Sequence, residues 1–458
     1  MLQAGLAEIE ITPPEYGNLG RLIANPMQVT GVICPLYARA VIIDDGTVRT
    51  AILCIDMGFM FPSCVEEIRE HVAAAGGLEK TNIMVCCTHT HNSFSLSPWH
   101  QGDTTDFAEL DYLKGLLREL IADAAGNMAP CRVRAGTAQA TGWTKNRRPL
   151  YRDAKGALHV GTHGPEDVES FVEVEGPIDD ELKVLFFEGE DGSALGGLVN
   201  FAMHPITMFG QPVYSSSYIG PLTEALKAKY GGVFGFLYGL SGNLCPSVAG
   251  DGEEINHRIG TALAKVAEEA ISSATPLSDS SVSISREVIA MPLRRVTPAQ
   301  IRAAKKYQKM DPAEVDMHEL CHALYGHDFI FYGDMTGYAE IFVDEIIGTW
   351  EHHRRMATRH PTADVEVQVI RLGDAALVGF SSEQFCEIKH EIQSVSPFTH
   401  TFFSSVTNGG TGYMPTREAF ANGGYETCTG VSSPYVEDAL ERVKESALRQ
   451  LRALAERS

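Results

Sequence analysis

The segment Ile83-Met-Val-Cys-Cys-Thr-His-Thr-His91 decides how this sequence is interpreted, because a short apolar run ends directly in two closely spaced histidines. Residues 83–87 have the length and composition of a buried strand. Side chains alternate between the two faces of a strand, so the pattern predicts that His89 and His91 share one face. Two imidazoles that leave one strand end together suit metal binding by one and proton transfer by the other. The alternative is a pair of hydrogen-bonded histidines beneath a loop.

The charge balance narrows the class of ligand. The chain has 458 residues, with 59 acidic and 37 basic side chains and a formal net charge of −22. Such a charge repels nucleic acid and anionic lipid surfaces, and it favours neutral or cationic small molecules and metal ions. We therefore expect a small-molecule substrate, no nucleic-acid partner and no stable membrane association.

The first residues and the cysteines bear on the cellular compartment. The start, Met1-Leu-Gln-Ala-Gly-Leu-Ala-Glu-Ile-Glu10, has neither a basic beginning nor an apolar signal core. No apolar run approaches the ~20 residues that cross a bilayer. The 10 cysteines include the adjacent Cys86 and Cys87 and form no CxxC pair, which is typical of reduced, buried thiols. A cytoplasmic location is the expectation.

The apolar patterns predict an α/β fold, a layered sandwich of mixed β-sheets flanked by helices. Strand-like runs alternate with amphipathic stretches of helical period in both halves of the chain. Strands are predicted over residues 32–43, 50–55, 82–87, 182–187, 197–202, 365–372, 375–380 and 401–406. Helices are predicted over residues 64–75, 107–125, 221–230, 254–271 and 434–455. Because no repeat or low-complexity linker interrupts the chain, residues 1–458 are expected to form one domain.

Residues 297–359 differ from the rest, because they are largely helical and rich in histidine. We expect a helical insertion that caps one end of the sheets. Together with the loop 93–100, the cap residues Tyr325, Phe329, Phe331 and Tyr332 would close a partly polar pocket. The alternative is that the inserted helices form the contact of a homo-oligomer.

Several segments, taken in order, carry a resemblance to one known family. They are Gly5-Leu-Ala-Glu-Ile-Glu-Ile-Thr-Pro-Pro14, Gly31-Val-Ile-Cys-Pro-Leu-Tyr-Ala-Arg-Ala40, Ala51-Ile-Leu-Cys-Ile-Asp56, Thr88-His-Thr-His91, Asn146-Arg-Arg-Pro149, Asn200-Phe-Ala-Met-His204, Gly242-Asn-Leu-Cys-Pro246, Phe380-Ser-Ser-Glu383, Tyr413-Met-Pro-Thr-Arg-Glu418 and Tyr425-Glu426. These segments resemble the neutral/alkaline ceramidase family of zinc-dependent amidases. Collinear order over most of the chain is more specific than any one motif. The sequence resembles a divergent member of that family that ends without its additional C-terminal β domain.

The resemblance implies a zinc ion held by His89, His204, Glu383 and Tyr413. Two imidazoles, a carboxylate and a phenol are donors suited to zinc, with room left for water. Each of these residues follows a predicted strand, so separate strand ends are expected to converge on one ion. For Glu383 the alternative is the first turn of a helix beginning near Ser382, where the helix dipole favours a carboxylate.

The family pattern also assigns catalytic roles. Zinc-bound water is acidified towards neutrality and attacks a carbonyl carbon, and the resulting oxyanion needs hydrogen-bond donors. His91 is the predicted acid/base, and Arg147 and Tyr425 are predicted to stabilise the oxyanion or hold the scissile group. A solvent-exposed arginine is the alternative for Arg147, and the adjacent Arg148 fits that alternative better. Cys245 stands where the family has serine, and it is either a nucleophilic thiolate or a small buried side chain.

These features together predict a zinc-dependent hydrolase that cleaves a C–N bond of a soluble compound. Residues 92–100 and 214–217 depart from the glycine-rich and asparagine-rich loops of the family, which argues against ceramide as the substrate. An ester or lactone hydrolase, or a true ceramidase, could use the same residues. A catalytically silent protein that binds a metal or a small molecule is a further alternative.

The insertion contains a rival metal motif. His318-Glu-Leu-Cys-His322 fits the HExxH pattern of metallopeptidases, in which two histidines one helical turn apart bind zinc and Glu319 is the base. Glu340 or Asp344 would supply the third ligand. Glycines between this motif and Glu340 weaken the prediction, because they interrupt the helix.

Overall fold

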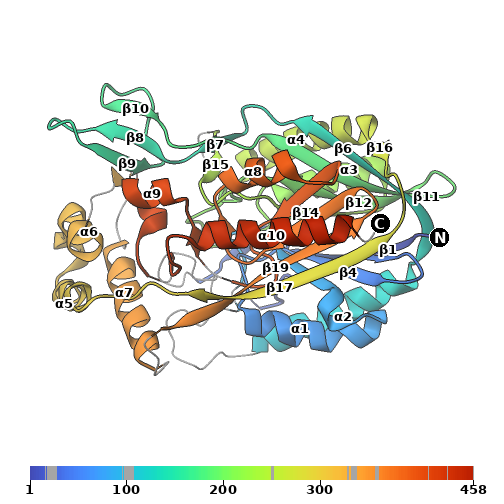
Figure 1. Ribbon diagram of the computed structural model, residues 1–458, viewed down its shortest axis with the longest axis horizontal. Helices are drawn as coiled ribbons and strands as arrows, with labels where there is room; N and C mark the ends of the chain where they lie inside the picture. Colours follow the sequence, from blue (N-terminus) through green and yellow to red (C-terminus); the bar gives the residue numbers. More distant parts are fainter. Residues whose placement is uncertain are drawn as a thin grey trace.

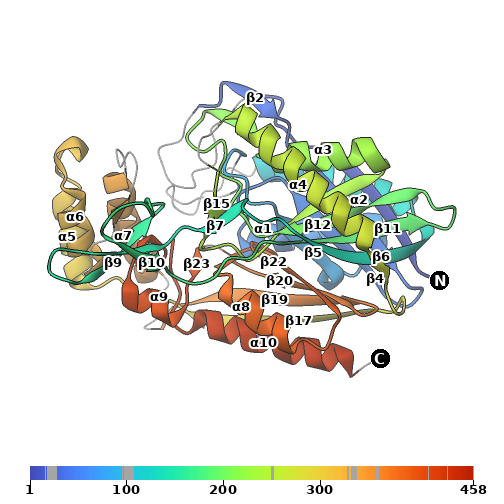
Figure 2. The ribbon, with the colours of Figure 1, turned by 90° about the horizontal axis from the view of Figure 1, so that it is seen from above.

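The computed structural model describes residues 1–15, 17, 28–94, 96, 108–248, 252–326, 330–331, 338–355, 360–410, 412–430 and 432–456. Two β-sheets lie face to face at its centre, and helices cover the outer face of each (Figures 1 and 2). The predicted α/β sandwich of mixed sheets is therefore confirmed. Both termini lie at one end of the sandwich, and the inserted helices lie at the other.

The larger sheet has nine strands and carries helices on its outer face. Its order is β14-β12-β11-β6-β1-β3-β4-β5, with β16 beside β6. These strands are β1 (Gln3–Glu10), β3 (Tyr37–Asp44), β4 (Arg49–Ile55), β5 (Ile83–Cys87), β6 (Ala129–Gln139), β11 (Glu181–Gly189), β12 (Ala194–Phe201), β14 (Val233–Tyr238) and β16 (Thr275–Pro276). The covering helices are α1 (Pro62–Gly76), α2 (Ala108–Gly126), α3 (Ile219–Tyr230) and α4 (Glu253–Ser273). Val72, Leu117 and Leu263 point from three of these helices into the core against the sheet.

The smaller sheet packs against the inner face of the larger one. It consists of β17 (Val282–Pro292), β19 (Thr362–Leu372), β20 (Ala375–Phe380) and β22 (His400–Ser404). Helices α8 (Glu387–Val395) and α10 (Ala439–Ala455) cover its outer face. Between the sheets, Leu185 and Leu198 of the larger sheet join one buried cluster with Ile370 and Leu377 of the smaller one. Burial on both faces explains why β12 and β20 read as nearly continuous apolar runs.

Within the two main sheets, three pairs of neighbouring strands are parallel: β4 with β5, β12 with β14, and β20 with β22. Parallel strands end at the same edge of a sheet, so the loops that follow them are neighbours. The histidine pair follows β5, His204 follows β12 and Glu383 follows β20. The topology therefore brings distant parts of the sequence to one edge of the sandwich.

Residues 297–359, which we call the insertion after their predicted role, contain α5 (Pro298–Tyr307), η2 (Pro312–Glu314), α6 (Met317–Tyr325), β18 (Ile330–Phe331) and α7 (Tyr338–Arg355). Strand β18 adds to a small sheet of β8 (Pro149–Arg152), β9 (Leu158–Thr162) and β10 (Phe171–Val174). The inserted helices share a buried cluster with Tyr413 and Tyr425. Tyr325 belongs to the edge of this cluster, whereas Phe329, Tyr332, the side chain of Phe331 and most of loop 93–100 lie outside the described residues.

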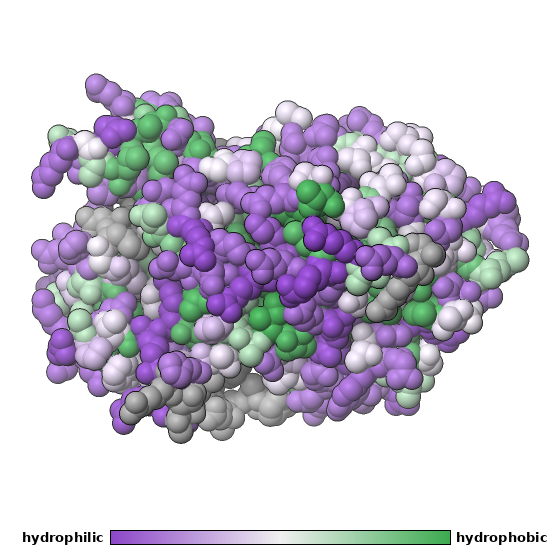
Figure 3. All heavy atoms as spheres, viewed as in Figure 1, coloured by the Kyte–Doolittle hydropathy of each residue, from purple (hydrophilic) through white to green (hydrophobic). Residues whose placement is uncertain are grey.

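The face of the molecule in Figure 3 is mainly hydrophilic. Its hydrophobic atoms lie in separate groups, one of them over β8–β10, where Leu158 and Val172 are 44% and 40% exposed. Within the described residues, no helix has the length and apolar composition needed to cross a membrane.

Several element boundaries differ from the prediction. The strand predicted over 32–43 is divided into β2 (Gly31–Cys34) and β3, because Pro35 lacks the amide hydrogen that a continuous ladder needs. The last helix begins at Ala439, after Pro434 and an extended segment, and not at residue 434. The long antiparallel strands β1, β6 and β17 were not predicted. In β17, exposure alternates only over residues 285–291, and there the apolar Val288 is on the exposed face while Glu287 is partly buried.

A buried ion pair ties helix α1 to the smaller sheet past edge strand β5. Arg69 Nη2 lies 2.8 Å from Glu366 Oε1, and Arg286 Nη2 lies 2.6 Å from Glu366 Oε2. Asn408, in the loop that leads towards Tyr413, donates to the same carboxylate at 2.8 Å. Burial opposes ionisation of Glu366, but hydrogen bonds from the two arginines outweigh it and lower its pKa.

Replacing Glu366 by alanine should therefore destabilise the fold. Arg69 would lose its buried carboxylate partner and keep the exposed carboxylate of Glu66, so we expect a loss of about 3 kcal/mol in the free energy of unfolding, measured with urea near neutral pH. Because the folded-state pKa of Glu366 is lowered, the wild-type advantage should shrink as the pH falls below its ordinary value of 4.5. The control is Glu287→Ala on β17, whose carboxylate pairs with the exposed Arg449 and should contribute less than about 1 kcal/mol. Equal losses for the two variants would contradict the assignment.

Candidate metal centre and active site

His89 lies just beyond β5, in a backbone conformation that only the surrounding loops can hold. Its φ is 67°, a left-handed value that costs a non-glycine residue on the order of 1–3 kcal/mol. The amide of His89 donates to Met57 O at 2.8 Å, and that of Thr88 donates to Ile55 O at 2.9 Å. The sequence predicted that strand alternation would place His89 and His91 on one face. This reason is wrong, because β5 ends at Cys87, before either histidine. The two rings nevertheless lie together, with centroids 4.9 Å apart.

Two backbone carbonyls fix the orientation of the rings of His89 and His204. His89 Nδ1 lies 2.6 Å from Gly58 O, and His204 Nδ1 lies 2.9 Å from Leu244 O. A carbonyl can only accept, so each Nδ1 carries the ring proton. The lone pair of each neutral ring is then on Nε2, which is the arrangement found in metal-binding histidines.

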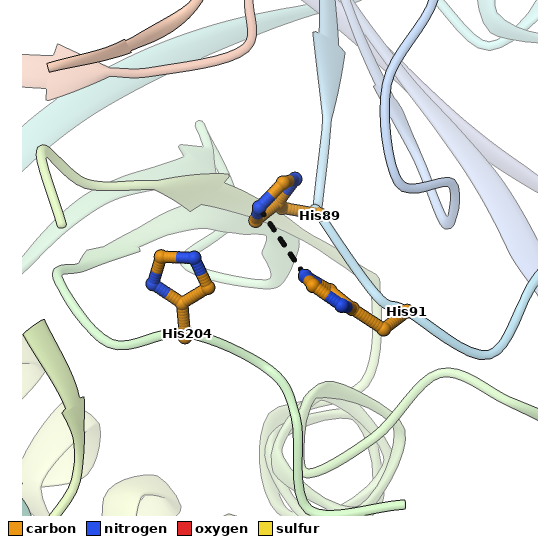
Figure 4. A group of neighbouring side chains, drawn as sticks. All are labelled: His89, His91 and His204. Carbon is orange, nitrogen blue, oxygen red and sulfur yellow. Dashed lines mark hydrogen bonds between the residues drawn. The ribbon is translucent and has the colours of Figure 1, made fainter. Parts of the chain in front are cut away.

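Both of these nitrogens face the carboxylate of Glu383. Glu383 Oε2 lies 3.1 Å from His89 Nε2 and 3.1 Å from His204 Nε2. We call these three atoms the donor cluster. The ring nitrogens of His89, His91 and His204 also lie within 4.8 Å of one another, and Figure 4 shows the three rings around a common space.

The donor cluster has the chemistry of a cation site. Burial, and then the nearby charge of Arg147, lower the pKa of His204 to about 4, so this ring is neutral at physiological pH. Burial opposes ionisation of Glu383, whereas positive charge and hydrogen-bond donation at the two facing rings lower its pKa well below the usual range. With neutral rings, a bound cation would supply that positive charge. Two lone pairs and a buried carboxylate that point at one position repel one another unless a cation lies between them. Nitrogen and oxygen donors in this combination suit a divalent metal such as zinc.

Tyr413 lies beside Glu383, and Arg147 lies beside Tyr413. Strand β21 (Glu383–Gln384) pairs in parallel with β23 (Tyr413–Met414), which sets Glu383 directly beside Tyr413. Arg147 shares a hydrogen bond with the Tyr413 side chain, and its guanidinium carbon lies 5.3 Å from the centre of that ring. Burial raises the pKa of Tyr413. The phenol is therefore protonated in the absence of a metal.

Both arginines of the Asn146-Arg-Arg-Pro149 segment are buried, so the solvent-exposed alternative is wrong for each. Arg147 Nε donates to Glu426 Oε1 at 2.8 Å, and its Nη2 donates to Gly242 O at 2.7 Å. Arg148 Nη1 lies 2.5 Å from Glu426 Oε2 and pairs also with Glu175. The shared carboxylate of Glu426 thus holds the Arg147 charge beside Tyr413.

Tyr425 lies against Tyr413, with ring centroids 5.6 Å apart and the planes at 69°. It begins the short helix η3 (Tyr425–Thr427) and packs on Phe342 of the insertion. Burial raises its pKa well above the usual range. The hydroxyl is therefore protonated at neutral pH.

His91 differs from the other two histidines, because no carbonyl fixes its ring. Its Nε2 lies 3.4 Å from His89 Nε2, and its Nδ1 is buried with no hydrogen-bond partner in the described part of the chain. Burial lowers the pKa of His91 well below its ordinary value. A neutral, unanchored imidazole beside the donor cluster can act as a base or as a further ligand.

Cys245 has the properties of a buried thiol. It belongs to β15 (Leu244–Pro246), which pairs with β7 (Thr144–Asn146), and its side chain is 1% exposed. Burial raises the pKa of the thiol to about 11, in spite of the positive charge of Arg147. Little thiolate would form at neutral pH.

Two residues that the sequence did not indicate also belong to the site. Tyr238, the last residue of β14, stacks on His89 with centroids 4.7 Å apart, and its hydroxyl lies 3.0 Å from His204 Nδ1. His163 follows β9 at a φ of 59°, and its amide donates to Arg147 O at 3.0 Å. Burial, and then Arg147, lower the pKa of His163 to about 3. Recognising Val233–Tyr238 as a strand would have drawn attention to Tyr238, whereas the isolated His163 carries no motif.

The rival arrangements receive no support from the described residues. His318, Glu319 and His322 are exposed on α6, which turns Leu320, Cys321 and Leu324 inwards. Among the described residues, the three-histidine group around His89 is the one cluster of three or more metal-binding side chains. The helical alternative for Glu383 is wrong, because this residue lies in β21 and α8 begins at Glu387.

Solved structures with the same fold are ceramidases. The chain superposes over its full length on 75% of the neutral ceramidase from Pseudomonas aeruginosa, with a TM-score of 0.73 and 19% identity. A ceramidase complexed with C2 gives a TM-score of 0.72 and 18% identity, with the same coverage of both chains. No protein-family model matches the sequence. The predicted likeness to neutral ceramidases is confirmed at the level of the fold.

Metal analysis of the purified protein tests the donor cluster. If zinc is the cation, we expect about one zinc per chain, and His204→Ala or Glu383→Ala should lose most of it because each removes one donor. His91→Ala should retain zinc if this ring is a base, and lose it if the ring is a ligand. His318→Ala is the control in the HExxH motif and should retain zinc. Zinc lost only in His318→Ala would place the site in the insertion.

Proposed function

We propose that this chain, which has the fold of the neutral ceramidases, is a zinc-dependent hydrolase that cleaves a C–N amide bond of a small soluble molecule. The observation that carries the proposal is the donor cluster, in which two imidazole lone pairs and the Glu383 carboxylate meet at one buried position. The ceramidase likeness supports hydrolysis of an amide as the reaction. The formal charge of −22 supports a neutral or cationic substrate.

The residues proposed to hold the metal are His89, His204, Glu383 and Tyr413. Bound zinc supplies Lewis acidity, which lowers the pKa of a water ligand and polarises a carbonyl oxygen. The carbonyls of Gly58 and Leu244 keep the Nε2 lone pairs of the two histidines directed inwards. The ring protons therefore need not move when the metal binds.

His91 is the proposed proton carrier. Its lowered pKa keeps the ring neutral, so it can accept the proton of the attacking water at Nε2, the nitrogen that faces the donor cluster. The water oxygen bonds to the carbonyl carbon, and the same proton then passes to the amide nitrogen as the C–N bond breaks. The products are a carboxylic acid and an amine.

Tyr425 and Arg147 are proposed to stabilise the tetrahedral oxyanion. Arg147 is fixed by Glu426 and Gly242, so its positive charge needs no rearrangement as negative charge develops. Tyr425 retains its proton because burial raises its pKa. A preorganised cation beside a phenol is a suitable environment for an oxyanion.

A second candidate function differs from the first in the bond that is cleaved and in the substrate. Ester and lactone hydrolysis use the same attack on a carbonyl carbon, and the likeness to ceramidases makes ceramide itself the second candidate substrate. Ligand binding without turnover is the remaining alternative. The soluble-substrate proposal rests on the charge of the chain and on the inserted helices, which pack on Tyr413 and Tyr425 beside the site.

A panel of substrates tests this proposal. Short N-acyl compounds, matched esters and lactones, and ceramides of increasing acyl length should be compared by kcat/KM. We expect short polar amides to be cleaved best, with Glu383→Ala as the inactive control. Efficient cleavage of long-chain ceramides alone would establish the second candidate, and binding without turnover would remove the hydrolase assignment.

The Cys245→Ser variant tests whether the nucleophile is water or a thiolate. Because the thiol has a pKa of about 11, we expect the variant to keep its kcat within about threefold of the wild type, and no acyl adduct to accumulate. Mass spectrometry of the protein during turnover of a slow substrate is the measurement. An adduct on Cys245, with loss of activity in the variant, would establish covalent catalysis.

A further inference from the structure

Helix α7 of the insertion carries a buried carboxyl group that the proposed reaction does not use. Glu345 is 5% exposed, and it faces the segment that follows Tyr425. Its Oε1 accepts a short hydrogen bond from the Ser432 hydroxyl, and the Ser432 amide bonds the same carboxylate. The backbone at Gly430 passes so close that a Cβ there would lie 2.7 Å from Glu345 Oε2.

Ser432 is the point at which both tyrosines of the site are attached. Its carbonyl oxygen accepts from the amide of Tyr413 at 2.8 Å. Its side chain shares a hydrogen bond with the Tyr425 hydroxyl. One serine thus connects the backbone of a proposed metal ligand, the side chain of a proposed oxyanion donor and a carboxyl group of the insertion.

We propose that Glu345 is a positioning residue that holds Tyr413 and Tyr425 in place through Ser432. The inference rests on the proposed function, because it predicts a loss of catalytic rate when Glu345 is replaced. The rest of the interface supports it, since Phe342, one turn before Glu345 on α7, packs on the Tyr425 ring at 6.4 Å. The insertion therefore forms part of the support of the site, in addition to any role as a cap.

The side chain at position 345 must accept a hydrogen bond from Ser432. Tyr325, Tyr425 and Cys428 lie around the carboxyl group, and burial raises its pKa to about 7. Glutamine has the same shape and an acceptor oxygen, so Glu345→Gln should preserve the link. Alanine removes the acceptor, so the Ser432 amide and the hydroxyl proton of Ser432 lose the partner that they have in Glu345.

Steady-state kinetics of Glu345→Ala and Glu345→Gln test the proposal. Misplacing catalytic groups by about 1 Å costs up to ~100-fold, so we expect Glu345→Ala to lower kcat by about 10-fold to 100-fold with little change in KM. Glu345→Gln should stay within about threefold of the wild type. Asp344→Ala, an exposed neighbour on the same helix, is the matched control and should be unchanged.

Ser432 supplies the second arm of the test. If Glu345 acts through Ser432, the double variant Glu345→Ala/Ser432→Ala should lose much less than the product of the two single losses. Hydrogen exchange should show faster exchange of the Tyr413 amide in Glu345→Ala, with zinc content and exchange in β12 unchanged. This readout does not need a substrate.

The outcomes separate the two proposals. A wild-type protein that cleaves no member of the panel contradicts the proposed function, whatever the variants do in hydrogen exchange. Wild-type turnover with an unchanged Glu345→Ala variant contradicts only the positioning role. Loss of zinc in proportion to activity, or an equal loss in Glu345→Gln, would also overturn the positioning role.

Discussion

The structure of the site depends on one electrostatic constraint, the meeting of three acceptor atoms in a buried space. His89 Nε2 and His204 Nε2 each lie 3.1 Å from Glu383 Oε2, although the ring protons of both histidines are bonded to carbonyls on the opposite side. Such an arrangement is unfavourable in itself, because it brings a buried negative charge against two lone pairs. A metal ion between the three atoms would turn the same repulsion into binding energy.

Hydrogen bonds to buried groups hold the loops that carry the donor cluster in one conformation. Ser382, Val406 and Asn408 have left-handed φ values of 76°, 48° and 59°. Val406 is β-branched and so is strained most. Its amide donates to Ser382 O at 2.9 Å, and Asn408 donates to the buried Glu366 at 2.8 Å. Strained residues thus occur where loops from β20 and β22 turn towards the donor cluster, and hydrogen bonds to buried groups keep them there.

The sequence predicts the fold class well because burial imposes a period on each element. The run at 83–87 and the helical spacing of Leu113, Leu117 and Leu120 are sufficient to place a core strand and a core helix. The boundaries fail where a single residue decides them, as at Pro35, and where burial is uneven, as in β17. Strand ends also predict a meeting point for His89, His204 and Glu383. The predicted geometry of the His89–His91 pair was wrong, because alternation holds only within the ladder and β5 ends before Thr88.

Residues whose role depends on tertiary contacts cannot be recognised from a pattern in the sequence. The ring orientation of His204 depends on Leu244 O, which is 40 residues away in the chain, and no pattern of residue types records a backbone carbonyl. Glu345 illustrates the same limit, because an isolated glutamate within an amphipathic helix is normally solvent-exposed. It is buried here because α7 packs on the loop that holds both tyrosines. If the insertion supports the proposed catalytic site, as we infer, it cannot be exchanged freely, because its length and helix packing are then constrained by the chemistry that it supports.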